Sequence, residues 1–189
     1  MFDALVIGAS AGGMKALKTV LSGLPRDFPL AVAIVQHMAS HSDSYMAEYL
    51  AACCPLPVKE ADDKEDFRKG AVYLAPAGYH LLIEPDRILS LSVDPPVNFS
   101  CPSIDVLFDS AAGVYGSRLI GVVLTGASAD GSAGLKRIKE RGGTAIVQDP
   151  AGAEVSFMPQ SAITAAAPEH IAALDDIAPL LLKLCRQAL

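Results

Sequence analysis

Short runs of consecutive apolar residues alternate along the chain with segments whose apolar residues recur every three or four positions. An uninterrupted apolar run is typical of a strand that is covered on both faces, as in a parallel sheet. We therefore predict strands, in chain order, at 4–7, 30–35, 71–75, 119–124, 144–147 and 170–174.

Several of the segments between these runs have the periodicity of amphipathic helices. They predict helices at 14–24, 43–52, 103–115, 130–138, 159–166 and 177–184. Residues 80–92 instead indicate two short strands around a tight turn. The expected fold is α/β: a doubly wound, mostly parallel sheet flanked by helices, with a β-hairpin insertion. No linker or repeat divides the chain, so residues 1–189 are predicted to form a single domain.

Composition narrows the class of protein. The chain is 51% hydrophobic with a formal net charge of −6, and its basic residues are dispersed, which argues against a nucleic-acid partner. No apolar run approaches the roughly 20 residues that span a bilayer, so membrane insertion is not expected. The start lacks a basic leader, and the four cysteines show no Cys-x-x-Cys spacing, as expected in a reduced compartment. We predict a soluble, cytoplasmic protein.

The stretch after the first predicted strand carries candidate chemistry. Gly8-x-Ser10-x-Gly12 leads from the strand into the first helix. This spacing matches a nucleophile elbow, in which a serine is exposed above a parallel sheet. A helix N-terminus at the same place could stabilise an oxyanion or bind a phosphate, so a nucleotide-binding loop is the rival interpretation.

Three polar residues follow predicted strands at the edge of the sheet where ligands bind in such folds. Ser10 follows the first strand, His37 the second, and Asp130 lies in the loop after the strand that ends at Leu124. A hydroxyl, an imidazole and a carboxylate can act as nucleophile, general base and orienting anion. Each also has a purely structural alternative: Ser10 and Asp130 as helix N-caps, and His37 as a histidine bonded to the backbone.

The other histidines and the first loop also bear on substrate, metal and cofactor binding. His80 follows a strand and a turn and is predicted to contact substrate, whereas His170 begins its strand and belongs at the opposite edge. The pair His37-x-x-x-His41 lacks the glutamate of a zinc-protease motif, so no metal is expected. Met14 replaces the last glycine of a dehydrogenase-type loop, and the chain has no Tyr-x-x-x-Lys. An NAD(P)-binding domain is therefore a remote alternative, and no cofactor is expected.

Separated segments together resemble the catalytic domain of chemotaxis protein-glutamate methylesterases, the CheB type. The matching segments, in the family's order, are 6–13, 35–38, 60–62, 70–76 with Gly78 and His80, 102–108, 124–126 with Asp130 and Gly131, and 148–149 with Met158 and Pro159. They span nearly the whole chain, which makes the resemblance far more specific than Gly-x-Ser-x-Gly alone.

The resemblance implies a serine esterase with the triad Ser10, His37 and Asp130. It implies hydrolysis of glutamyl methyl esters on the cytoplasmic helices of chemoreceptors, and some members also deamidate receptor glutamines. Backbone N–H groups near Ala11, Gly12 and Ala127 are the expected oxyanion donors. A catalytically weak module that binds helical signalling proteins through the same crevice is the alternative function.

The chain departs from the family pattern at four places. Position 11 is Ala where Thr is usual, position 127 is Ala where Met is usual, and position 101 is Cys where Arg is usual. The fourth concerns the receiver domain that commonly precedes the catalytic domain, because Asp3 leads directly into the first strand. The chain is then either an excised domain or a free-standing enzyme. We expect constitutive activity, with a separate receiver protein as the alternative means of regulation.

Overall fold

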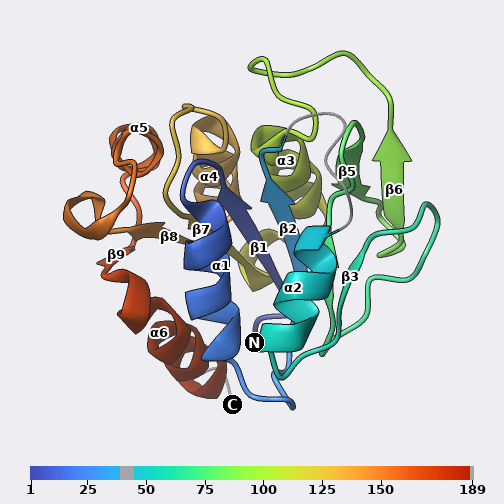
Figure 1. The fold of residues 1–189 in the computed structure, drawn as a ribbon, viewed down its shortest axis with the longest axis horizontal. Coiled ribbons are helices and arrows are strands. Elements are labelled where there is room, and N and C mark those ends of the chain that lie inside the picture. The colour runs from blue at the N-terminus through green and yellow to red at the C-terminus, as the bar shows by residue number, and fades with distance from the viewer. Residues whose placement is uncertain (39–44, 188–189) are drawn as a thin grey trace.

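The structure, a computed structural model, describes residues 1–38 and 45–187. Its centre is a seven-stranded sheet in the order β3-β4-β2-β1-β7-β8-β9, in which every pairing is parallel (Figure 1). The strands are β1 (Ala4–Ala9), β2 (Ala31–Gln36), β3 (Val58–Glu60), β4 (Val72–Leu74), β7 (Leu119–Val123), β8 (Thr144–Gln148) and β9 (His170–Ala172). The predicted parallel α/β sheet is confirmed.

Helices cover both faces of this sheet because its strands are apolar on both sides. One face packs against α1 (Gly13–Ser22), α2 (Tyr45–Cys53) and α6 (Leu174–Gln187). The other packs against α3 (Ile104–Tyr115), α4 (Ser132–Glu140) and α5 (Phe157–Ala166). Two short 3₁₀ turns, Gly116–Arg118 and Pro150–Gly152, complete the helical elements among the described residues. The β1 side chains alternate between the two cores: Val6 belongs to the second core, and Leu5 and Ile7 to the first.

The predicted hairpin is present as β5 (His80–Ile83) paired antiparallel with β6 (Leu89–Ser92), outside the main sheet. Leu81, Ile83 and Leu89 are buried in the same core as α3. The hairpin therefore closes one end of the α3 face.

Several predicted boundaries were wrong by a few residues. The strand β3 was not predicted, because its three residues alternate in exposure and include two charged side chains. The helix α5 begins two residues before the predicted start, since Pro159 fits within its first turn. Of the helix predicted at 43–52, positions 43 and 44 lie outside the described residues.

The chain order places a topological switch point at β1. From β1 the chain crosses to β2 on one side, and it later returns to β7 on the other side. In open α/β sheets, ligands bind beyond the carboxyl ends of the strands at such a point. Ser10 directly follows β1 and so lies there.

Candidate active site

The loop after β1 holds Ser10 by its backbone. The Ser10 N–H donates to the Thr125 carbonyl at 2.9 Å, and the Ser10 carbonyl accepts from Gly13 N–H at 2.8 Å. The N-cap of α1 is Gly12, with φ of 77°, and no side chain caps this helix. Ser10 is therefore not the helix cap, and its hydroxyl makes no hydrogen bond within the described ranges.

His37 lies directly beside Ser10. Ala9 pairs with Gln36 in the β1–β2 register, and the His37 N–H donates to the Ala9 carbonyl at 3.0 Å. Ser10 and His37 are thus equivalent positions one residue beyond adjacent strands, which lie about 4.8 Å apart. The His37 side chain is 13% exposed, and its Nε2 lies 2.8 Å from Asp130 Oδ2. Its Nδ1 has no hydrogen-bond partner among the described residues.

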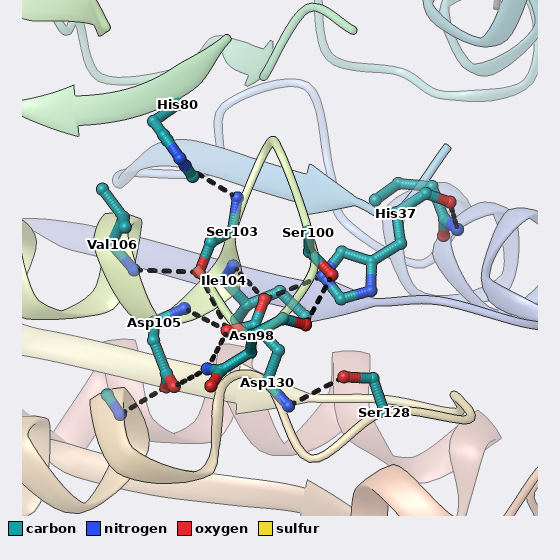
Figure 2. A network of polar contacts seen from close by, with 12 residues as sticks. His37, His80, Asn98, Ser100, Ser103, Ile104, Asp105, Val106, Ser128 and Asp130 are labelled. Atoms are coloured by element: carbon teal, nitrogen blue, oxygen red, sulfur yellow. Dashed lines mark hydrogen bonds and ion pairs between the residues drawn. The ribbon is translucent and has the colours of Figure 1, made fainter. Parts of the chain in front are cut away.

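Asp130 is fully buried and accepts hydrogen bonds from several donors besides His37 (Figure 2). The donors are Ile104 N–H at 2.6 Å, Ser103 Oγ at 2.9 Å, Asn98 Nδ2 at 3.1 Å and Asp105 N–H at 3.2 Å. Two of them are backbone groups in the first turn of α3, where the positive end of the helix dipole favours an anion. The helix cap suggested for Asp130 in α4 is absent, because Gly131, with φ of 93°, is the N-cap there.

The environment keeps the Asp130 carboxylate ionised. Burial alone would raise the pKa of this carboxyl, but the hydrogen bonds from His37, Asn98, Ile104 and Ser103 outweigh it and lower the pKa. The neighbouring Asp105 shifts the other way: burial and the charge of Asp130 raise its pKa, against hydrogen bonds from Gly134, Gly131 and Asn98. An ionised Asp130 can hold the His37 ring and stabilise its protonated form.

A pocket of about 900 Å³ opens beside Ser10 and His37. Its lining combines the loop after β1 with an apolar, methionine-containing wall: Ser10, Ala11, Gly12, Gly13, Met14, Lys15, Gln36, His37, Met38, Tyr45, Met46 and Glu154. Within the part of the chain that the structure describes, the N–H groups of Ala11, Gly12 and Ala127 have no hydrogen-bond acceptor. Ala11 and Gly12 line the pocket, so their N–H groups can bind an oxygen of a bound molecule, whereas Ala127 is not among the lining residues.

The Thr125 hydroxyl connects the loop after β1, which contains Ala11, with the loop after β7, which contains Thr125. Thr125 Oγ1 donates to the Ala11 carbonyl at 2.9 Å and accepts the Val155 N–H at 2.9 Å. Gln148 Oε1 in turn accepts the Thr125 N–H at 2.9 Å. These contacts hold the backbone of Ala11 and Thr125 without the side chain of Ala11.

The structure places His80 differently from the sequence expectation. Its ring is 1% exposed, its Nδ1 accepts the Ser103 N–H at 3.1 Å, and its Nε2 lies 3.2 Å from the Pro95 carbonyl. His80 is absent from the pocket lining and supports the start of α3 instead. His170 begins β9 as predicted. His41 lies outside the described residues.

Sequence reasoning missed the residues that surround Asp130. Ser103 and Asn98 both bond to it, and Asn98 Nδ2 also donates to Asp105 at 2.9 Å (Figure 2). Asn98 sits in a turn with φ of 50°, a conformation in which asparagine is enriched. The sequence indicates a helix start at Ser103 and a loop at Asn98, but it does not indicate that both side chains bond to Asp130.

Serine, histidine and aspartate at one sheet edge form the arrangement of hydrolases that use serine as a nucleophile. The family model described as CheB methylesterase matches residues 5–181. The Thermotoga maritima CheB methylesterase catalytic domain superposes with a TM-score of 0.93 at 33% identity, covering 97% of this chain and 99% of that one. The chain belongs to the CheB methylesterase family.

Two similar relatives differ in how much of their length the chain matches. A Leptospira interrogans protein named putative protein-glutamate methylesterase/protein-glutamine glutaminase is 50% identical, covering 97% of this chain and 95% of the relative. Protein-glutamate methylesterase FrzG of Myxococcus xanthus is 39% identical, covering 96% of this chain and 54% of FrzG.

No helix within residues 1–38 or 45–187 is long and apolar enough to cross a membrane.

Proposed function

We propose that this chain hydrolyses methyl esters of glutamyl side chains in chemoreceptors, with Ser10 as nucleophile, His37 as general base and Asp130 as the anion that orients His37. The observation that carries the proposal is the 2.8 Å contact between His37 Nε2 and buried Asp130, at the rim of the pocket that contains Ser10. This contact fixes the tautomer in which Nδ1 lacks a proton and can accept one.

In the first half-reaction, Ser10 Oγ bonds to the ester carbonyl carbon while His37 Nδ1 takes the hydroxyl proton. The carbonyl oxygen becomes an oxyanion, and the N–H groups of Ala11, Gly12 and Ala127 stabilise it. The bond to the methoxy oxygen then breaks, and His37 returns its proton to that oxygen. Methanol leaves and an acyl-enzyme remains.

In the second half-reaction, water attacks the acyl carbon and His37 takes a proton from it. The bond to Ser10 Oγ breaks, Oγ regains the proton from His37, and the glutamate is released. The same sequence applied to a glutamine side chain releases ammonia in place of methanol. This second reaction agrees with the name of the Leptospira interrogans relative, which combines methylesterase and glutaminase.

The pocket suits a helical substrate. Met14, Met38, Met46 and Tyr45 line it beside the serine, and flexible methionines adapt to the apolar face of a partner helix. We propose that the methylated helices of chemoreceptors bind there, in the cytoplasm. Residues 1–189 would act as one catalytic domain, and a separate receiver protein is the proposed regulator.

Methanol release from a methylated receptor fragment tests the proposal. We expect the wild type to release methanol and Ser10→Ala to lose this activity by several orders of magnitude, because the nucleophile is gone. Equal release by the two proteins would refute the proposed function. Binding of the fragment without turnover would favour the binding module instead.

A further inference from the structure

Gln36, the last residue of β2, connects the two reacting residues by one side-chain group. Its Nε2 donates to the Ser10 carbonyl at 2.8 Å and to the His37 carbonyl at 2.9 Å. The side chain is buried, with 7% exposed. A single NH₂ group therefore spans the end of β1 and the end of β2.

Both partners of Nε2 are carbonyl oxygens, which only accept hydrogen bonds. The side chain at this position must supply two donors at once, as a primary amide does. An ionised glutamate supplies none, and a methionine of similar length supplies none either. Glutamine therefore fits this position because it supplies two N–H donors, and not only because of its size.

The other end of the amide adds a second observation. Gln36 Oε1 is buried without a hydrogen-bond partner in the described part of the chain. A Cβ on Gly13 would lie 1.8 Å from this oxygen and 2.9 Å from the Ala9 Cβ. Gly13 is the first residue of α1, a position that other residues can occupy in a helix. Glycine is required at this position because any side chain would collide with the Gln36 amide.

An unpaired buried oxygen costs stability and offsets part of what the two Nε2 hydrogen bonds contribute. We propose that Gln36 is a positioning residue that sets the distance between Ser10 and His37. On the opposite side, Ser10 is fixed by its N–H bond to the Thr125 carbonyl. Gln36 supplies the tie toward β2, and Gly13 leaves the space in which the amide lies. The inference rests on the proposed function, in which Ser10 transfers its proton to His37.

The first test replaces the amide by a side chain of similar length that cannot donate. In Gln36→Met, we expect the rate of Ser10 labelling by a fluorophosphonate and kcat for methanol release to fall by about 10²-fold, as for an error of 1 Å in positioning. KM should change little, because the pocket remains. Gln160→Met, at an exposed position of α5, makes the same chemical change away from the pocket and should label at the wild-type rate.

The second test uses pH to separate positioning from packing. Protonated Glu in Gln36→Glu can donate one hydrogen bond, whereas the ionised form presents oxygens to both carbonyls. The ratio of the variant's labelling rate to that of the wild type should therefore rise as pH falls. A ratio that does not change with pH would contradict the proposal.

The third test is a double-mutant cycle between Gly13 and Gln36. Gly13→Ala should slow labelling of Ser10 by displacing the amide. The same substitution should slow it less in a Gln36→Ala background, where only the Ala9 contact remains. If the fold losses in labelling rate of the two single variants simply multiply in the double variant, the residues act independently. That result would overturn the proposed role of Gly13.

These outcomes are distinct from failure of the proposed function. If wild-type Ser10 is not labelled and releases no methanol, the esterase assignment fails. If the wild type is active and Gln36→Met matches it in kcat and labelling rate, only the role of Gln36 fails. Melting temperatures of all variants show whether a lost rate reflects unfolding.

Discussion

The Asp130 carboxylate accepts the Ile104 N–H at 2.6 Å, so the start of α3 holds the anion that faces His37. The two residues come from segments 26 positions apart in the chain. This relationship makes the α3 N-terminus part of the proposed catalytic machinery, because it fixes Asp130 Oδ2 and favours its charge.

Replacing Asp130 by Asn should abolish most activity. The amide is close in shape, but it cannot stabilise a protonated His37, and its NH₂ group would face donors. By analogy with serine proteases, kcat should fall by about 10⁴-fold. Steady-state methanol release measures this, with circular dichroism to show that the variant is folded. Retention of a tenth or more of kcat would contradict the role of Asp130.

The same substitution should change how stability depends on pH. The folded-state pKa of Asp130 lies below the value of an unfolded aspartate, about 3.9, so its ionised form stabilises the fold above that pH. This contribution is lost as pH falls through the folded pKa. Urea unfolding between pH 5 and the acid limit should therefore show a shallower loss of stability in Asp130→Asn than in the wild type. Parallel curves would argue against a depressed pKa.

Thr125→Val should weaken the proposed oxyanion site by loosening the backbone that carries its N–H groups. It keeps the volume but removes the hydroxyl that bonds to the Ala11 carbonyl and the Val155 N–H. An unpaired buried group costs about 1–3 kcal/mol, so the free energy of unfolding should fall by that amount. The kcat should fall as well, with KM little changed. An unaltered kcat would show that the Thr125 hydroxyl does not position the loops.

His80→Phe distinguishes a structural histidine from one that contacts substrate. The ring loses its bond to the Ser103 N–H and its polar contact with the Pro95 carbonyl, so stability should fall by about 1–3 kcal/mol. KM for a receptor fragment should be unchanged, because His80 does not line the pocket. Chemical unfolding and steady-state kinetics measure the two effects. A raised KM in a protein of normal stability would restore the substrate contact predicted from the sequence.

Most of the sheet could be predicted because its strands are buried on both faces and therefore form continuous apolar runs, as in Leu119–Val123. The short edge strand Val58–Glu60 has no such run. It is a strand because it pairs with β4, and the local sequence does not indicate that pairing. Because residues that follow parallel strands share one edge of the sheet, the sequence also predicts that Ser10, His37 and Asp130 lie at the same edge.

The supporting contacts could not be predicted, because they join segments with no common pattern. Nothing at Asn98 or Ser103 in the sequence indicates that both reach Asp130. The burial of His80 could not be predicted for the same reason, because the hairpin that contains it lies outside the main sheet.

The most direct test of the central claim compares Ser10→Ala, His37→Ala and the double variant in methanol release. If serine and histidine act as one unit, each single variant loses nearly all of kcat and the double variant has about the same residual rate. A His37→Ala protein that keeps near wild-type kcat, or a double variant whose loss is the product of two independent losses, would contradict the account.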